Sequence, residues 1–259
     1  MKNILNRVCM CAICTCLLSC SVKEDRAPCP CFVSLDMTEC VGAGELIITV
    51  WNDGMVYKQY SSPAAGKDVI ECEIPKGVVT VSAISARSGA HLTGNLLEIP
   101  QGASPDSVYA CARRVDASGE NAWGRMKLSK QFASVSLDTR ETLYLGEEGC
   151  LEVRINVCGM DIRDLSAVSG DLVYTVYVSE DGIFRFCLPR IPDGRVELAI
   201  GKQGDLRYPL DLGAIMRRSG YDWDAADLSD INIRTGPSEG DLRFEIIPWR
   251  GFRMEDVVI

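Results

Sequence analysis

Histidine is almost absent from this sequence. The 259 residues include a single one, His91, in a glycine-containing stretch that is typical of a loop. A catalytic histidine needs a group that it activates and a second group that orients it, and the sequence identifies neither for His91. Phosphate-binding loops, the nucleophile elbow of hydrolases and the zinc-protease motif are missing as well. We therefore expect no enzymatic activity.

Neighbouring carboxylates are the remaining candidates for acid–base chemistry or metal binding. They occur at Glu147 and Glu148, at Asp222 and Asp224, and at Glu255 and Asp256. None of these pairs has the repeated spacing of oxygen ligands that a calcium loop requires. The sequence favours positions in turns or on the surface, and we expect neither a bound metal nor a cofactor.

Basic residues are scarce, and so are long apolar runs. The chain has 27 lysines and arginines against 36 acidic residues, a formal charge of −9. Proteins that bind nucleic acid neutralise its phosphates with basic side chains, so nucleic acid is not an expected partner. The apolar run over residues 8–18 is shorter than the roughly 20 residues that a membrane-spanning helix needs.

The start of the chain instead predicts an export signal. Lys2 and Arg7 form a positive segment before the apolar run, and residues 17–20 (Leu-Leu-Ser-Cys) look like a lipobox. We expect cleavage after residue 19 and lipidation of Cys20, because several acyl chains on one residue anchor a protein stably. The closely spaced cysteines within residues 9–16 belong to the removed signal, so they do not predict a metal site.

The mature chain starts with a polar segment, residues 20–31, which reads as a tether because it cannot build a core. Cys29 and Cys31 flank a proline and are poorly placed to bridge each other. In an oxidising compartment some of the eight cysteines after Cys20 could pair, but spacing does not define the pairs.

After the tether, short β-branched or alternating runs closed by turn residues predict an all-β chain. We expect two consecutive β-sandwiches, residues 32–128 and 129–259. The middle, including residues 101–106 and 117–120, is less regular. The expected strands are residues 32–37, 45–51, 55–60, 69–74, 78–85, 126–128, 133–137, 151–157, 172–178, 183–188, 195–200, 206–212, 231–235 and 242–248. Only residues 212–219 and 225–228 favour helices.

The aromatic residues allow two interpretations. Trp51 and Trp249 end apolar strands, so they favour core positions, and the same is expected of Trp123 and Trp223. If several tryptophans and tyrosines instead shared one exposed face, they would form a platform for carbohydrates. The sequence favours the core interpretation.

Several segments resemble the FimB-type fimbrillin family of the Bacteroidetes. They are residues 20–36, 126–133, 187–190, 208–210, 220–223, 228–233 and 248–249. The resemblance implies two transthyretin-like β-sandwich domains in a lipoprotein that anchors surface fimbriae or is a minor fimbrial subunit. It also implies that Lys23, Glu24 and Asp25 direct export to the outer face of the outer membrane. The chain has more cysteines than the family leads us to expect.

The resulting hypothesis is a non-enzymatic, lipid-anchored protein of the cell outer membrane and fimbrium. Its partners would be pilins, engaged by β-strand addition, and outer-membrane lipid through Cys20. Phe252, Met254, Val257 and Ile259 lie in a C-terminal segment that could be a donor strand, or could close its own domain. The alternative hypothesis is a surface glycan-binding lipoprotein.

Overall fold

The computed structural model describes residues 29–40, 45–63, 69–86, 91–141, 143, 145–236 and 242–250. Strands dominate these ranges, which confirms the predicted all-β class. The strands of the first half are β1 (Cys31–Glu39), β2 (Glu45–Asn52), β3 (Met55–Pro63), β4 (Val69–Ile74), β5 (Val78–Ala86), β6 (His91–Thr93), β7 (Leu96–Glu98), β8 (Val108–Asp116) and β9 (Asn121–Lys127).

The described residues of the second half add nine strands and two short helical segments. The strands are β10 (Ser129–Lys130), β11 (Phe132–Asp138), β12 (Gly149–Asp161), β13 (Ser166–Tyr177), β14 (Ile183–Pro189), β15 (Val196–Lys202), β16 (Asp205–Asp211), β17 (Asp230–Thr235) and β18 (Leu242–Ile247). The helical segments are η1 (Gly146–Glu148) and α2 (Leu212–Arg218). No helix among the described residues is long and apolar enough to cross a membrane.

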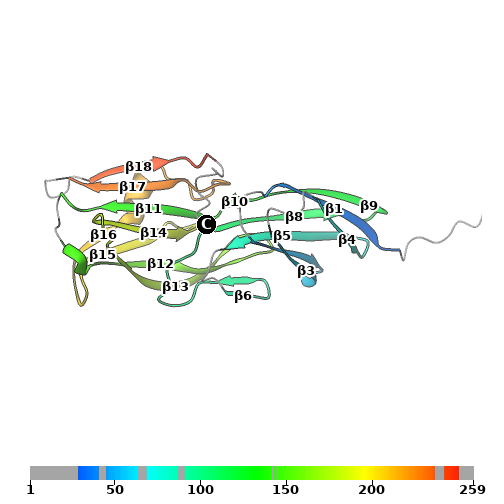
Figure 1. Cartoon of the computed structure of the whole chain (residues 1–259), viewed down its shortest axis with the longest axis horizontal. Coiled ribbons are helices and arrows are strands. Elements are labelled where there is room, and N and C mark those ends of the chain that lie inside the picture. The colour runs from blue at the N-terminus through cyan, green and yellow to red at the C-terminus, as the bar shows by residue number, and fades with distance from the viewer. Residues whose placement is uncertain are drawn as a thin grey trace, which may run out of the picture.

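Two pairs of sheets lie end to end and give an elongated molecule (Figure 1). The first sandwich consists of a three-stranded sheet, β4-β1-β9, and a five-stranded sheet, β10-β8-β5-β2-β3. Alternate side chains point into the space between these sheets, as the period of a strand requires. In β1 the inward side chains are Cys31, Val33, Leu35 and Met37, all buried.

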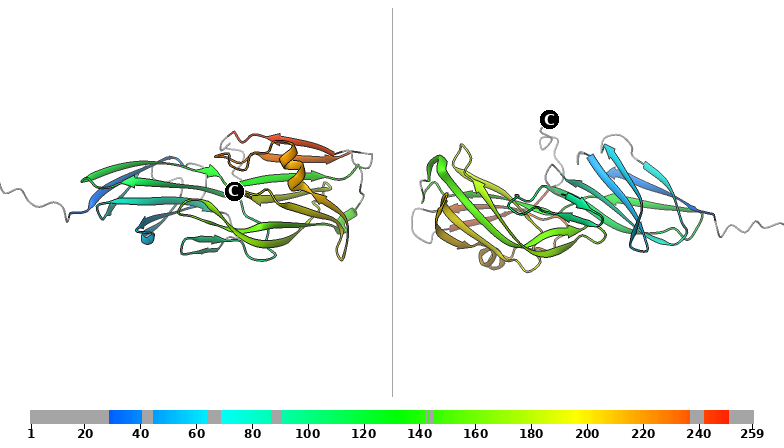
Figure 2. Two further views of the ribbon diagram at one scale, coloured as in Figure 1. Left: turned by 180° about the vertical axis from the view of Figure 1, so that it is seen from behind. Right: turned by 90° about the horizontal axis from the view of Figure 1, so that it is seen from below.

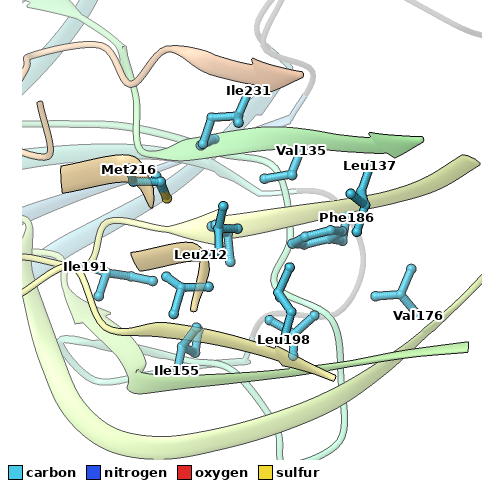
Figure 3. Packing of buried hydrophobic residues seen from close by; sticks show 14 of the residues in the cluster. Val135, Leu137, Ile155, Val176, Phe186, Ile191, Leu198, Leu212, Met216 and Ile231 are labelled. Carbon is cyan, nitrogen blue, oxygen red and sulfur yellow. The ribbon is translucent and has the colours of Figure 1, made fainter. Parts of the chain in front are cut away.

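The second sandwich has a four-stranded sheet, β14-β11-β17-β18, opposite a sheet in which β12 pairs with β13, β15 and β7. Aliphatic and aromatic side chains from both sheets fill its core (Figure 3). Helix α2 covers one side of this core with Leu212 and Met216. The helix starts where expected because the Asp211 carboxylate accepts a hydrogen bond from the Ala214 N–H at 2.7 Å.

Strands and side chains from both halves of the chain meet at the junction of the two sandwiches. The β6–β7 hairpin, which comes from the first half of the chain, pairs with β12 in a sheet of the second. A small core lies between the halves and joins Trp51 and Ile84 of the first sandwich to Leu97 and Ile162. Figure 2 shows the same arrangement from two further sides.

A buried polar network also ties the junction together. Lys130, only 2% exposed, bonds to the Asp230 carboxylate, donates to the Leu228 carbonyl at 3.3 Å and lies 4.6 Å from the centre of the Phe132 ring. A buried charge is tolerated only where it is paired in this way. The network lies within the segments that resemble the fimbrillin family.

Most expected strands agree with the structure, but two expectations were wrong. The middle contains a full strand, β8, where none was expected, and β9 starts five residues before the expected strand 126–128. Residues 225–228 form no helix, because the carbonyls of Ala225 and Ala226 accept hydrogen bonds from Arg190. Those carbonyls are therefore not used in helical hydrogen bonds.

Candidate functional site

The residues predicted for lipidation, export and strand donation lie outside the described residues. These are Cys20, Lys23, Glu24, Asp25, Phe252, Met254, Val257 and Ile259. The strands that lead out of the predicted tether and towards the C-terminal segment, β1 and β18, are described. They define the candidate site as two strand regions, one at each end of the folded chain.

Strand β1 is held on both sides. It runs antiparallel to β4, with Cys31 opposite Ile74, and parallel to β9, with Ser34 opposite Trp123. The Phe32 N–H also donates to the Glu120 carbonyl at 2.8 Å. Because its inward side chains fill the first core, the strand that follows the predicted tether is an integral part of this sandwich.

Strand β18 is the edge of its sheet. Among the described strands it pairs with β17 alone, from Asp230 opposite Ile247 to Thr235 opposite Leu242. Phe244 and Ile246 point towards the second core but remain half-buried. An edge strand with free backbone groups and partly exposed apolar side chains can accept a further strand.

Arginine side chains line the outer face of the same sheet. Arg234 of β17 lies directly opposite Arg243 of β18, and both are exposed. Like charges at directly opposite positions destabilise a sheet. Asp138 of β11 pairs with Arg234 at 3.7 Å, but Arg243 has no ion-pair partner in the part of the chain that the structure describes. In the row of Asp138, Arg234 and Arg243, a further carboxylate could therefore pair with Arg243.

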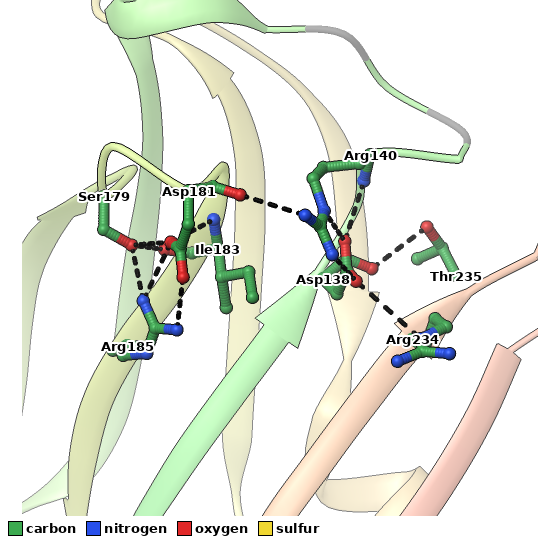
Figure 4. Close-up of polar contacts among 8 residues, drawn as sticks. All are labelled: Asp138, Arg140, Ser179, Asp181, Ile183, Arg185, Arg234 and Thr235. Carbon is green, nitrogen blue, oxygen red and sulfur yellow. Dashed lines mark hydrogen bonds and ion pairs between the residues drawn. The ribbon is translucent and has the colours of Figure 1, made fainter.

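Arg140 completes this surface (Figure 4). Its Nε and Nη2 donate to the two oxygens of Asp138 at 2.9 and 2.8 Å, and these bonds hold the pKa of that carboxyl below its usual value. The Asp138 carboxylate is thus already paired with Arg140. A groove of about 510 Å³ runs over this face, between Asp138 and Glu245.

A second charged cluster closes the neighbouring β13–β14 turn. Arg185 donates to both oxygens of Asp181 at 2.9 and 2.5 Å, and the Ser179 hydroxyl donates to the same carboxylate at 2.8 Å. These hydrogen bonds hold the pKa of Asp181 well below its usual value. The cluster rigidifies the turn beside the arginine row.

Among the described residues, the groups considered for catalysis do not assemble into a reaction centre, and Glu255 and Asp256 lie outside these residues. His91 is exposed on β6, opposite Glu98 of β7. Asp222 and Asp224 lie in the loop before β17, where the Asp222 carboxylate accepts from the Asp224 N–H at 2.9 Å. Over the described ranges, no group of three His, Cys, Asp or Glu side chains could hold a metal ion.

The tryptophans divide between the core and the surface. Trp51 and Trp223 are buried, which agrees with the expectation of core positions. Trp249 is only half-buried and lies against Tyr109, with ring centroids 5.9 Å apart. Trp123 is exposed, so its expected core position was wrong. Its side chain faces outward because the residues on either side of it in β9, Ala122 and Gly124, face the first core.

Phe32 and Trp123 share the outer face of the β4-β1-β9 sheet, but the exposed tyrosines lie on other sheets. Trp123 lies on β9, Tyr57 on the edge strand β3 and Tyr177 on β13, in three different sheets. A carbohydrate platform of several tryptophans and tyrosines is therefore not assembled from these residues.

The cysteines of the described chain are free thiols. Cys31, Cys40, Cys72 and Cys150 are buried. Burial raises the pKa of Cys40 to about 11, so its thiol is protonated at neutral pH and a poor nucleophile.

Sequence reasoning missed the arginine row and the junction network. Alternation in β17 and β18 does place Arg234 and Arg243 on the outward face. Their opposition depends on the register between the two strands, which the sequence does not provide. Lys130 shows no sign of burial in the sequence, because its partner Asp230 lies 100 residues further along the chain.

No family model and no curated protein sequence matches this chain. Solved structures do. A candidate polysaccharide-binding protein from Bacteroides thetaiotaomicron matches with TM-score 0.61 and 11% identity, over 87% of this chain and 99% of that one. A candidate adhesin from Bacteroides ovatus matches with TM-score 0.59 and 11% identity, over 90% and 98%.

The fimbrial anchor protein Mfa2 from Porphyromonas gingivalis is also similar, with TM-score 0.56 and 14% identity over 84% of this chain and 95% of that one. At sequence identities this low, the structural matches establish a shared fold and nothing more. The chain therefore shares its fold with this anchor protein, as the resemblance of its sequence motifs to the fimbrillin family led us to expect.

Proposed function

We propose that this protein is a lipid-anchored structural component of the cell surface, a fimbrial anchor or minor fimbrial subunit. The observation that carries this proposal is the position of β1. The strand that follows the predicted lipid-bearing tether is hydrogen-bonded to β4 and β9 and contributes four side chains to the first core. A tether that continues into such a strand transmits its load directly to the folded domain.

The geometry of β1 suits a load-bearing role. A pull on the tether acts along β1, so the hydrogen bonds to both neighbouring strands are loaded in shear and must fail together. Extraction of β1 would also expose Val33, Leu35 and Met37 to water, at a cost of about 1.5–3 kcal/mol for each. The protein would keep this strand and remain attached to its lipid.

Strand addition at β18 is the proposed mode of contact with other subunits. An incoming strand could pair with the free edge of β18 and cover Phe244 and Ile246. An acidic residue on that strand could reach Arg243, which has no carboxylate partner among the described residues. The C-terminal segment with Phe252, Met254, Val257 and Ile259 is the proposed donor in the opposite direction.

The proteins of similar fold support a surface role, although their names describe different functions. One is a fimbrial anchor protein, one a candidate adhesin and one a candidate polysaccharide-binding protein. The scattered exposed aromatics favour the fimbrial role over glycan binding. We place the protein on the outer face of the outer membrane, with pilins as partners and no catalytic activity.

Loss of the lipid site tests this proposal in cells. Cys20→Ala removes the thiol that accepts the diacylglyceryl group, so fimbriae should be shed into the medium while the Ser21→Ala control keeps them attached. Mass measurement of the N-terminus would report acylation in the wild type. Fimbriae that stay on Cys20→Ala cells in normal amount would contradict the anchor role.

A further inference from the structure

Two aromatic side chains, Phe32 and Trp123, lie exposed on the outer face of the β4-β1-β9 sheet, and we call them the aromatic patch. Their exposed fractions are 54% and 59%. In the parallel register Phe32 is opposite Asn121 and Trp123 is opposite Ser34. The two residues are therefore diagonal neighbours, on the order of 7–8 Å apart, a spacing that long side chains can bridge.

The aromatic patch lies where the folded chain starts. Phe32 is the second residue of β1 and Trp123 the third of β9, and β1 begins at the end of the first sandwich that points away from the second (Figures 1 and 2). Phe32 follows Cys20 in the sequence by twelve residues, which span at most about 40 Å when extended. A lipid on Cys20 would keep the patch within that distance of the bilayer.

The surroundings of the patch match a membrane interface. Arg125 lies over Trp123, with its guanidinium carbon 5.6 Å from the ring centroid, and pairs with Asp36 at 3.3 Å. Tryptophan lies well at the level of lipid headgroups, phenylalanine just below it, and an arginine beside them can extend its charge into water or to a phosphate. Glu73, opposite Phe32 on β4, favours zwitterionic over anionic lipid.

We propose that the aromatic patch rests on the lipid surface that holds Cys20 and forms a second, non-covalent membrane contact. This inference depends on the lipid anchor of the proposed function. A lipidated tether alone leaves the orientation of the protein free. The patch would hold the outer face of the first sheet against the bilayer and so fix the direction in which the second sandwich extends.

Contact with lipid can be measured by bromine quenching. The full-length lipidated protein is reconstituted into phosphatidylcholine vesicles with plain or brominated acyl chains, and tryptophan emission is compared. We expect emission to fall in brominated vesicles and Trp123→Phe to remove most of that fall, because Trp51 and Trp223 are buried and Trp249 lies against Tyr109 near the junction. Phe32→Ser should reduce the quenching at least twofold.

Tyr177→Ser is the matched control, because Tyr177 is 58% exposed but lies on β13 of the second sandwich. It should leave the quenching unchanged, and all three variants should unfold at the wild-type temperature. Equal quenching in wild type and Trp123→Phe, or no quenching at all, would overturn the proposal. Emission that responds to soluble polysaccharide but not to bromine would identify a glycan surface and overturn it as well.

Mass measurement of the same sample separates this proposal from the one it depends on. An unacylated Cys20 would count against the proposed anchor. The quenching would then be measured on protein attached through a lipid-bound N-terminal tag, with the same expected and contrary results for the patch.

Discussion

Two tryptophans of the second half of the chain occupy different environments. Trp223 is 7% exposed and packs edge-to-face on Tyr221, with ring centroids 4.8 Å apart. Its indole N–H is buried beside Gly194 and has no hydrogen-bond partner among the described residues. Trp249 is half-buried and contacts Tyr109 of the first sandwich. The first contributes apolar packing, and the second joins the end of β18 to the junction.

These environments predict different costs of truncation. Trp223→Ala should lower the free energy of unfolding by about 3–5 kcal/mol, because it leaves a cavity in the core. Trp223→Phe should cost much less, since the indole N–H has no partner to lose. Trp249→Ala should lower the free energy of unfolding by less than about 3 kcal/mol, because its side chain is only half-buried. Denaturant unfolding measures all three, and a Trp223→Ala cost under about 1 kcal/mol would contradict the packing role.

At the scale of single elements, the sequence predicts strands well where inward and outward residues alternate. The register of β12, with Leu151, Val153 and Ile155 inward, follows that pattern. Strand β8 and the first five residues of β9 were missed because their patterns are interrupted. In β9, Gly124 occupies a core position where a Cβ would lie 3.3 Å from Leu35 and Val115, so the alternation of large inward residues is broken before Met126.

Pairing between strands is the part that sequence reasoning could not reach. The entry of the β6–β7 hairpin into the sheet of β12 depends on contacts between residues about 60 positions apart. The opposition of Arg234 and Arg243 and the position of β18 at the edge of the described sheet likewise depend on how the strands pair. Local patterns define which residues face inward, but only the packed structure defines which strand is an edge.

The C-terminal segment gives a prediction at this scale. Deletion of residues 252–259 should abolish incorporation into fimbriae but leave the unfolding midpoint unchanged, because a donor strand completes a sheet of another subunit. Met254→Leu is the matched control and should incorporate normally. A lower midpoint after the deletion would instead show that the segment closes its own domain.

For the whole molecule, the two ends of the chain leave from different places. β1 begins at the outer end of the first sandwich, while Trp249 lies against Tyr109 near the junction (Figure 1). β18 and the arginine row belong to the second sandwich, remote from the start of β1. An attachment at the first sandwich therefore leaves the edge of β18 available to a partner.

Exposure of the protein on the cell surface should depend on the predicted export signal in the tether, Lys23, Glu24 and Asp25. Replacing Lys23, Glu24 and Asp25 with alanines leaves the folded residues and Cys20 unchanged, so lipidation and the unfolding midpoint should be those of the wild type. The protein should nevertheless be retained on the inner leaflet of the outer membrane, because such an address is read by the export machinery and not by the fold. Protease treatment of intact cells would then leave the variant uncut while it digests the wild type, and the Val22→Ala control should be digested like the wild type. Digestion of the triple variant at the wild-type rate would show that the address lies in another part of the chain.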